Sequence, residues 1–208
     1  MTLTNKALGK VLKAFLLVAV VLSGLLLITT TFYVYAYDVF LEMMAFDQAL
    51  TVLYQIVWFI SLILYFIWIF QVHADIQKIT PYYDIKPGGA LLRIFIPFYN
   101  LYGLWNIYST MGNYFICYSK LEKLGKQLLR LIPVYYFLYF GSGILQRLLT
   151  KGYIVNDTVI FIYYILDFAF MISIFLMTKN ILNAFKVMED DPETYIIKEE
   201  SPSAWVNE

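Results

Sequence analysis

Histidine, cysteine and charged residues are scarce in this chain of 208 residues. Its single cysteine, Cys117, excludes an intrachain disulfide and any metal site that is built from several cysteines. Its single histidine, His73, excludes a histidine cluster. Charged residues make up only 14% of the chain and hydrophobic residues 61%, so long uncharged runs would leave large apolar patches in water. A water-soluble domain is therefore excluded.

Sequence motifs of the common enzyme classes are also missing. The chain contains no glycine-rich phosphate loop, no nucleophile elbow and no paired-carboxylate pattern. Its basic residues match no nucleic-acid-binding motif. His73 and Asp75 are too few to form a metal site or a catalytic pair, and we expect them at a solvated helix end. The sequence thus predicts a protein that is not an enzyme and that has no cofactor, no metal site and no nucleic-acid partner.

The chain has four long apolar runs instead. Each has roughly the 20 residues that a helix needs to cross a hydrocarbon core of about 30 Å. The runs cover residues 14–37, 50–72, 131–149 and 158–178. Aromatic residues reach 19%, which suits rings that lie at the lipid headgroups or between helices. We therefore predict an all-α integral membrane protein, a four-helix bundle in the lipid bilayer. Residues 38–48 are either an acidic loop or a continuation of the helix past the bilayer, since Asp38 and Glu42 lie four residues apart.

A fifth apolar segment, residues 88–126, follows a loop that we expect at residues 80–89, because Pro81 and Pro87 interrupt a helix. The positive-inside rule indicates whether this segment crosses the membrane. If it does not cross, 13 of the 15 basic residues lie on one side, whereas a fifth crossing divides them eight to seven. We therefore predict a non-spanning helical segment between spans two and three. It lies at the cytoplasmic interface, re-enters the membrane from that side, or packs into the bundle from there.

This topology makes residues 1–186 a transmembrane domain of a multi-pass cell-membrane protein and places both termini in the cytoplasm. Pro133 is expected in the first turn of the third span, where a helix tolerates proline. Residues 187–208 hold seven acids and one lysine and form an acidic cytoplasmic tail. Tyr195 and Trp205 belong either to a solvated terminus or to a peptide that becomes ordered on a cytoplasmic partner.

Polar side chains recur six or seven residues apart along one side of the non-spanning segment, with Gly103 and Thr110 at the positions between. They are Arg93, Asn100, Asn106 and Asn113. This interfacial polar stripe predicts either a pocket for a lipid headgroup or polar ligand, or the wet side of an interfacial helix. A basic cluster lies beside the third span and consists of Lys120, Lys123, Lys126 and Arg130. These charges attract the headgroups of an anionic leaflet, or they only mark the topology.

Asp167 lies near the middle of the fourth span, where a carboxylate costs on the order of 3 kcal/mol and usually faces the bundle interior. Tyr163 and Tyr164, one turn earlier, are further candidates. Hydroxyl residues at the matching depth of the other spans complete a predicted intramembrane polar site: Ser23, Ser61 and Ser142. Such a site either binds a proton or cation on a path through the bundle, or holds helices or subunits together.

The preferred function is that of a non-enzymatic accessory or scaffold subunit. It would associate with itself, as a homo-oligomer, or with a larger membrane-protein complex through its small-residue layer and aromatic surface. The alternative is a small channel or transporter component that uses Asp167 as a proton or cation site. The spans contain one buried charge and no continuous polar stripe, which favours the subunit.

Residues 67–114 resemble a family of small bacterial multi-pass membrane proteins, domain-of-unknown-function family 4328. The likeness rests on Trp68 at the aromatic end of the second span and on the run from Phe95 through Pro97 to Asn100 and Leu101. It departs where that family often has a further proline, since Tyr102 and the residues after it supply none. The resemblance implies a bacterial inner-membrane setting and no assigned activity.

Overall fold

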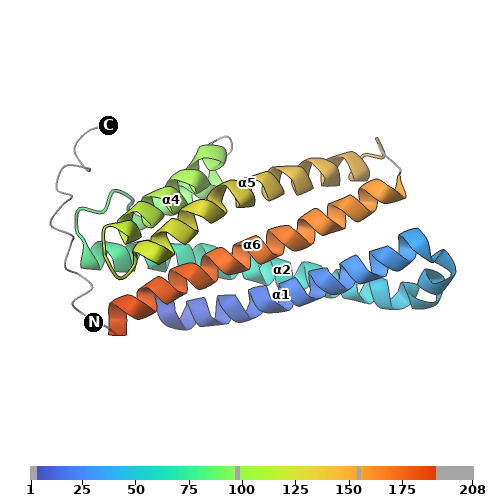
Figure 1. The fold of residues 1–208 in the computed structure, drawn as a ribbon, viewed down its shortest axis with the longest axis horizontal. Helices are drawn as coiled ribbons and strands as arrows, with labels where there is room; N and C mark the ends of the chain where they lie inside the picture. The colour runs from blue at the N-terminus through green and yellow to red at the C-terminus, as the bar shows by residue number, and fades with distance from the viewer. Residues whose placement is uncertain (1–3, 97–98, 154–155, 191–208) are drawn as a thin grey trace. The chain divides into compact units, whose positions relative to one another are not determined.

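The computed structural model describes residues 4–96, 99–153 and 156–190. The regular structure in these ranges is entirely helical (Figure 1), and the helices are α1 (Asn5–Tyr35), α2 (Tyr37–Ile79), α3 (Pro87–Phe95), α4 (Tyr99–Ile116), α5 (Glu122–Thr150) and α6 (Asp157–Asp190). Four of them, α1, α2, α5 and α6, are long and apolar enough to cross a membrane. The short helices α3 and α4 lie between the second and third candidate spans. The predicted all-α fold with four spans and an extra helical segment is confirmed.

One predicted loop is helical throughout, and another ends earlier than predicted. Residues 38–48 are not a loop but the first part of α2, because only Ala36 separates α1 from α2. The Ala36 N–H donates to the Phe32 carbonyl, and its own carbonyl accepts from the Phe40 N–H, so backbone hydrogen bonding continues through the junction. Gly88 and Gly89, expected in the loop before α3, are helical, since Pro87 occupies the start of α3, where proline is favoured.

Pro133 lies inside α5 and not in its first turn, because the helix begins at Glu122. A proline in a helix interior removes one backbone hydrogen bond and crowds the preceding turn. The chain divides into two compact units, and the division in α5 falls between Ile132 and Pro133. In the described ranges, unit 1 holds residues 4–10, 65–96, 99–132 and 177–190, and unit 2 holds residues 11–64, 133–153 and 156–176.

The core of unit 1 is built from one face of each contributing helix. On α2, Trp68, Ile69, Val72 and Ile76 are fully buried at the spacing of one helical face. Helix α1 approaches this face closely at Gly9, where an added Cβ would lie 2.7 Å from the Trp68 indole nitrogen. Helices α4 and α5 approach each other at Gly112 and Gly125, which leave their backbones in contact. Glycine therefore sets the helix spacing in this unit.

Unit 2 has a buried face on α1 that recurs every three or four residues: Leu16, Ala19, Leu22, Ser23 and Leu26. Gly24 faces the ring of Phe168 on α6. The Phe170 ring on the same helix lies 5.4 Å from the Tyr135 ring on α5, between centroids. Aromatic rings thus pack between helices, which is one of the two places where the high aromatic content predicts them.

The connection from α5 to α6 has defined caps at both ends. Gly152 adopts φ 68°, a left-handed conformation that glycine adopts without strain. The Gly152 N–H donates to the Leu149 carbonyl and the Tyr153 N–H to the Leu148 carbonyl, the bonding pattern of a Schellman cap. Asn156 then caps α6, because its Oδ1 accepts a hydrogen bond of 2.8 Å from the Thr158 N–H.

Candidate functional site

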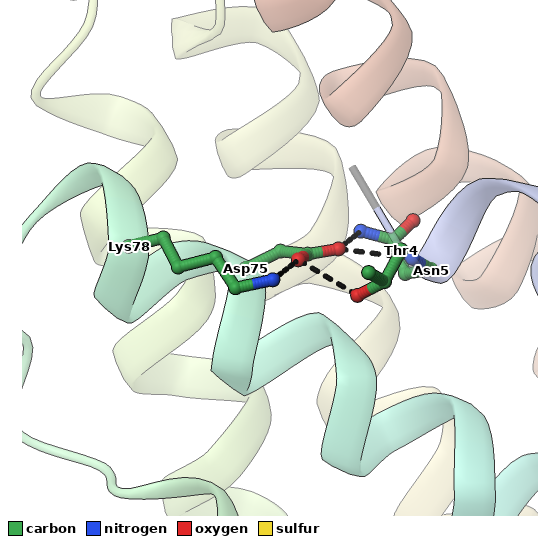
Figure 2. Close-up of polar contacts among 4 residues, drawn as sticks. All are labelled: Thr4, Asn5, Asp75 and Lys78. Carbon is green, nitrogen blue, oxygen red and sulfur yellow. Dashed lines mark hydrogen bonds and ion pairs between the residues drawn. The ribbon is translucent and has the colours of Figure 1, made fainter. Parts of the chain in front are cut away.

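The Asp75 carboxylate, near the end of α2 in unit 1, is fully buried and joins α2 to the start of α1. Its Oδ2 accepts hydrogen bonds of 2.9 Å from the backbone N–H and the side-chain amide of Asn5. Its Oδ1 accepts from the Thr4 hydroxyl at 2.8 Å and from Lys78 Nζ at 2.9 Å. Figure 2 shows these groups converging on the carboxylate. Because the first N–H groups of a helix have no partner within it, Asp75 caps α1 from another helix.

His73 lies two residues before Asp75 on the same helix and is also fully buried. The expectation that His73 and Asp75 mark a solvated helix end is therefore wrong. The imidazole stacks on the Tyr83 ring, with centroids 5.6 Å apart and planes at 29°. Both ring nitrogens of His73 and the Tyr83 hydroxyl are buried, and they have no hydrogen-bond partner within the described ranges. Folding thus places two polar rings in the interior of unit 1.

Arg93 and Asn106, two members of the predicted polar stripe, are brought together by α3 and α4. Arg93 Nη1 donates a hydrogen bond of 2.6 Å to Asn106 Oδ1. The close packing of the two helices depends on Gly103, because a Cβ there would lie 2.8 Å from the Arg93 Cβ and would meet the Arg93 carbonyl oxygen. Asn113 is exposed on α4, and the side chain of Asn100 lies outside the described residues.

A network of hydroxyl groups connects the end of α2 with α4. The Tyr114 hydroxyl is 3.0 Å from Thr80 Oγ1 and accepts a hydrogen bond of 3.2 Å from the Tyr118 hydroxyl. Burial raises the pKa of Tyr114 above its usual value, and the Tyr118 hydroxyl adds to that increase, whereas Thr80 opposes it. Burial also raises the pKa of Tyr83, with a further increase from Asp84 and an opposing effect of Arg93. Both phenols are therefore neutral and able to donate.

In unit 2, Asp167 is hydrogen-bonded across to α2. The Tyr54 hydroxyl donates to Asp167 Oδ2 at 2.7 Å, so the intramembrane carboxylate has a partner on another helix. Sequence reasoning found Asp167 and the neighbouring Tyr163 and Tyr164, but it missed Tyr54. Tyr54 occupies an ordinary position in an apolar span, and no pattern in the sequence distinguishes it.

The three serines predicted to lie with Asp167 bond to their own helices. Ser23 Oγ donates to the Val20 carbonyl at 3.0 Å, and Ser61 Oγ to the Val57 carbonyl at 2.7 Å. Ser142 Oγ donates to the Tyr139 carbonyl at 3.4 Å. A hydroxyl that bonds the preceding turn of its own helix satisfies its donor locally. Each serine therefore bonds within its helix rather than to the carboxylate.

Sequence reasoning also missed a second hydrogen bond between a hydroxyl and a carboxylate in unit 2. Thr29 Oγ1 on α1 donates to Asp47 Oδ1 on α2, at 2.5 Å. Asp47 belongs to the stretch expected to be a loop, and its place on α2 faces it towards α1. The phenol of Tyr164 lies within electrostatic range of both Asp47 and Asp167. Asp47 and Asp167 of unit 2 are thus each bonded to a hydroxyl group.

The predicted basic cluster lies at the α5 end of unit 1, where Lys120, Lys123, Lys126 and Arg130 are exposed. Lys126 Nζ donates to Glu122 Oε1 at 2.6 Å, one turn earlier on α5. An exposed pair of this kind contributes at most about 1 kcal/mol. Tyr195 and Trp205, the predicted docking residues, lie outside the described residues. Over the described ranges, no group of three or more histidine, cysteine or acidic residues is placed to hold a metal ion.

The chain matches no protein-family model, no curated protein and no solved structure. The resemblance of residues 67–114 to domain-of-unknown-function family 4328 therefore stays a prediction. What the helices establish is a multi-pass membrane protein with four candidate transmembrane helices.

Proposed function

We propose that this protein is a non-enzymatic accessory or scaffold subunit of a membrane, which associates with copies of itself or with a larger membrane complex. The hydrogen bond from Tyr54 to Asp167 carries this proposal. A carboxylate that accepts a hydrogen bond from a neighbouring helix links α2 to α6, and such polar bonds hold membrane helices together. Its role is then structural, as one of the two interpretations of the sequence predicts.

The bonding of the other span hydroxyls supports the same function. Ser23, Ser61 and Ser142 each donate to a carbonyl of their own helix. A conduction path needs polar groups that face a water-accessible lining, whereas these hydroxyls are used within their helices. The spans of unit 2 therefore favour a structural role over conduction.

The outward faces of the spans supply the surface for association. Between 17% and 33% of each span's most apolar stretch is buried within the chain, so the larger part is left for lipid or for other membrane subunits. Large apolar side chains are exposed on α2 and α5, including Phe59 at 60% and Phe137 at 71%. A Cβ on Gly143 would meet no atom within 4 Å, so this position of α5 is open within the single chain.

The mass of the purified protein tests this function. In mild detergent we expect either a defined oligomer of this chain or one membrane protein that co-purifies in a fixed ratio. Gly143→Leu places a side chain in open space of the single chain and should reduce association without unfolding. Val21→Leu, at an exposed position of α1, serves as the matched control. A monomer with no companion, in both detergent and lipid nanodiscs, would rule out the proposal.

The proposed orientation has both termini, α3 and α4 on the cytoplasmic side of a bacterial inner membrane, as the distribution of lysine and arginine favours. Labelling of single cysteines with a membrane-impermeant maleimide tests it in intact cells. In a Cys117→Ser background, Lys151→Cys should react from outside and Lys123→Cys only after the membrane is opened. The reverse pattern would overturn this topology.

A small channel or transporter component is the second candidate, favoured by the position of Tyr164 near both Asp47 and Asp167. Together with Thr29 and Tyr54, these groups form a string of polar side chains within unit 2. Proton or cation flux into proteoliposomes distinguishes the two functions. Flux that Asp167→Asn abolishes while assembly persists would favour transport, whereas background flux in both proteins would favour the scaffold.

A further inference from the structure

Buried polar atoms without a hydrogen-bond partner gather in unit 1. Across the described part of the chain, they are Asn5 Oδ1, Trp68 Nε1, Gln71 Oε1, both ring nitrogens of His73 and the Tyr83 hydroxyl. More than nine in ten buried polar groups of folded proteins are bonded, since leaving one unpaired costs about 1–3 kcal/mol. Where such atoms lie side by side, as on the stacked rings of His73 and Tyr83, they indicate a place where a group other than the chain itself binds.

His73 and Tyr83 contribute half of these atoms from two stacked rings. His73 comes from the end of α2 and is 0% exposed, and Tyr83 comes from the connection to α3 and is 6% exposed. An imidazole carries at least one N–H in either of its protonation states, and a neutral phenol carries an O–H. The stacked rings therefore present at least two hydrogen-bond donors from fixed positions.

Arg93 supplies the charge. Its guanidinium interacts electrostatically with both His73 and Tyr83. The hydrogen bond to Asn106 Oδ1 fixes the guanidinium and leaves the Asn106 amide group as a further donor. Within the residues that the structure describes, no carboxylate lies within ion-pair distance of Arg93, and Asp84, the acid that acts on Tyr83, is exposed. The cluster is thus rich in donors and positively charged.

A phosphate group matches this set best. Arginine binds phosphate oxygens with two parallel N–H groups, and the remaining oxygens accept from neutral O–H and N–H donors. A metal ion or an organic cation is disfavoured by the guanidinium, and water alone does not offset its charge. We propose that Arg93, Asn106, Tyr83 and His73 form a binding site for a phosphate group, carried by a lipid or by a soluble molecule.

The site is built where the end of a candidate span meets the two short helices. Helix α2 supplies His73, the connection to α3 supplies Tyr83, and α3 and α4 supply Arg93 and Asn106. The non-spanning helices therefore complete a site that α2 alone does not form. This proposal does not depend on the scaffold function and survives if the protein is a monomer.

Binding to the full chain in detergent tests the site, with two probes. The first is inorganic phosphate at constant ionic strength, measured by calorimetry. The second is short-chain phosphatidic acid, compared with the diacylglycerol of the same chain length, which lacks the phosphate. Binding of phosphate alone indicates a soluble ligand, and binding of phosphatidic acid alone a lipid headgroup. If the wild-type chain binds neither probe, the proposal is wrong.

Variants then assign the site to its residues. Arg93→Gln should weaken binding at least about tenfold, because a charge-assisted bidentate contact is lost. Tyr83→Phe should weaken binding about three- to tenfold while the ligand-free melting temperature does not fall, since the hydroxyl has no partner to lose. Lys186→Gln, at an exposed basic residue of α6 outside the basic cluster, should bind as the wild type does. Unchanged binding in both Arg93→Gln and Tyr83→Phe, or an equal loss in Lys186→Gln, would overturn the assignment.

Discussion

Tyr83 and Tyr114 pack edge to face in unit 1, with ring centroids 5.5 Å apart and planes at 74°. Both rings are buried, but only the Tyr114 hydroxyl has a hydrogen-bond partner within the described ranges, because it bonds to Thr80 and Tyr118. Two neighbouring tyrosines thus differ in one respect, the pairing of the hydroxyl. This contrast separates a hydroxyl that stabilises the fold from one that is available to a ligand.

Replacing each tyrosine by phenylalanine measures that difference. Tyr114→Phe should lower the free energy of unfolding by about 1 kcal/mol, because Thr80 and Tyr118 lose their shared partner. Tyr83→Phe should leave the ligand-free stability unchanged or raise it, since it removes a buried hydroxyl that nothing in the described chain satisfies. Thermal unfolding in detergent, without phosphate, measures both. Equal losses in the two variants would contradict the assignment of the hydroxyls.

Asp75→Asn should destabilise unit 1 by about 2–3 kcal/mol, because the charge that holds Thr4, Asn5 and Lys78 is lost in a buried position. The first turn of α1 should then exchange its amide hydrogens faster than in the wild type. Asp84→Asn is the matched control, since Asp84 is exposed in the neighbouring connection. Hydrogen exchange at residues 4–10 is the measurement, and protection as strong as in the wild type would remove the capping role of Asp75.

Gly125→Ala should separate α4 from α5. A Cβ at Gly125 would lie 2.6 Å from the Gly112 carbonyl oxygen and 2.9 Å from the Ile116 nitrogen, and backbone atoms cannot rotate away as a side chain does. We expect a loss of about 1–3 kcal/mol. Gly88→Ala, in α3 with no atom within 4 Å, should be neutral or gain up to about 1 kcal/mol. Unfolding in denaturant compares the two, and a neutral Gly125→Ala would disprove the close contact.

A double-mutant cycle isolates the bond between Tyr54 and Asp167. Tyr54→Phe and Asp167→Asn should each destabilise the protein, and their coupling should be about 1 kcal/mol, the usual size for a hydrogen bond between membrane helices. Thermal unfolding of the two single variants and the double variant in one detergent gives the coupling. Strict additivity of the two losses would show that the residues do not stabilise each other.

The sequence determined the parts of this protein that depend on local composition. A run of about 20 apolar residues is a property of a single segment, so the four spans and the extra helical segment between spans two and three were predictable. The ends of the helices were harder to predict, because a helix can continue past the bilayer wherever the residues that follow favour helix. Residues 38–48 show this, since α2 includes the acids that seemed to mark a loop.

The hydrogen bonds between polar side chains of different helices could not be predicted, because the bonded residues are far apart in the sequence. Asp75 bonds to Asn5, 70 positions away, and Asp167 bonds to Tyr54, 113 positions away. The sequence pattern relates Asp167 only to Tyr163 and Tyr164, because a periodic pattern connects residues of one helix. Arg93 and Asn106 were found, although the pattern did not reveal that the two lie on separate helices and bond directly.

The sequence alone therefore determined that this chain lies in a membrane, which segments are apolar enough to span it and where its charges gather. Tertiary structure alone decided that His73 and Asp75 are buried, since Asp75 meets the start of α1 and His73 stacks on Tyr83 in the connection to α3. Hydrophobicity acts on each segment independently, whereas a buried polar group is tolerated only where other segments meet it. For this reason the apolar spans could be predicted from the sequence, whereas the buried polar contacts required the tertiary structure.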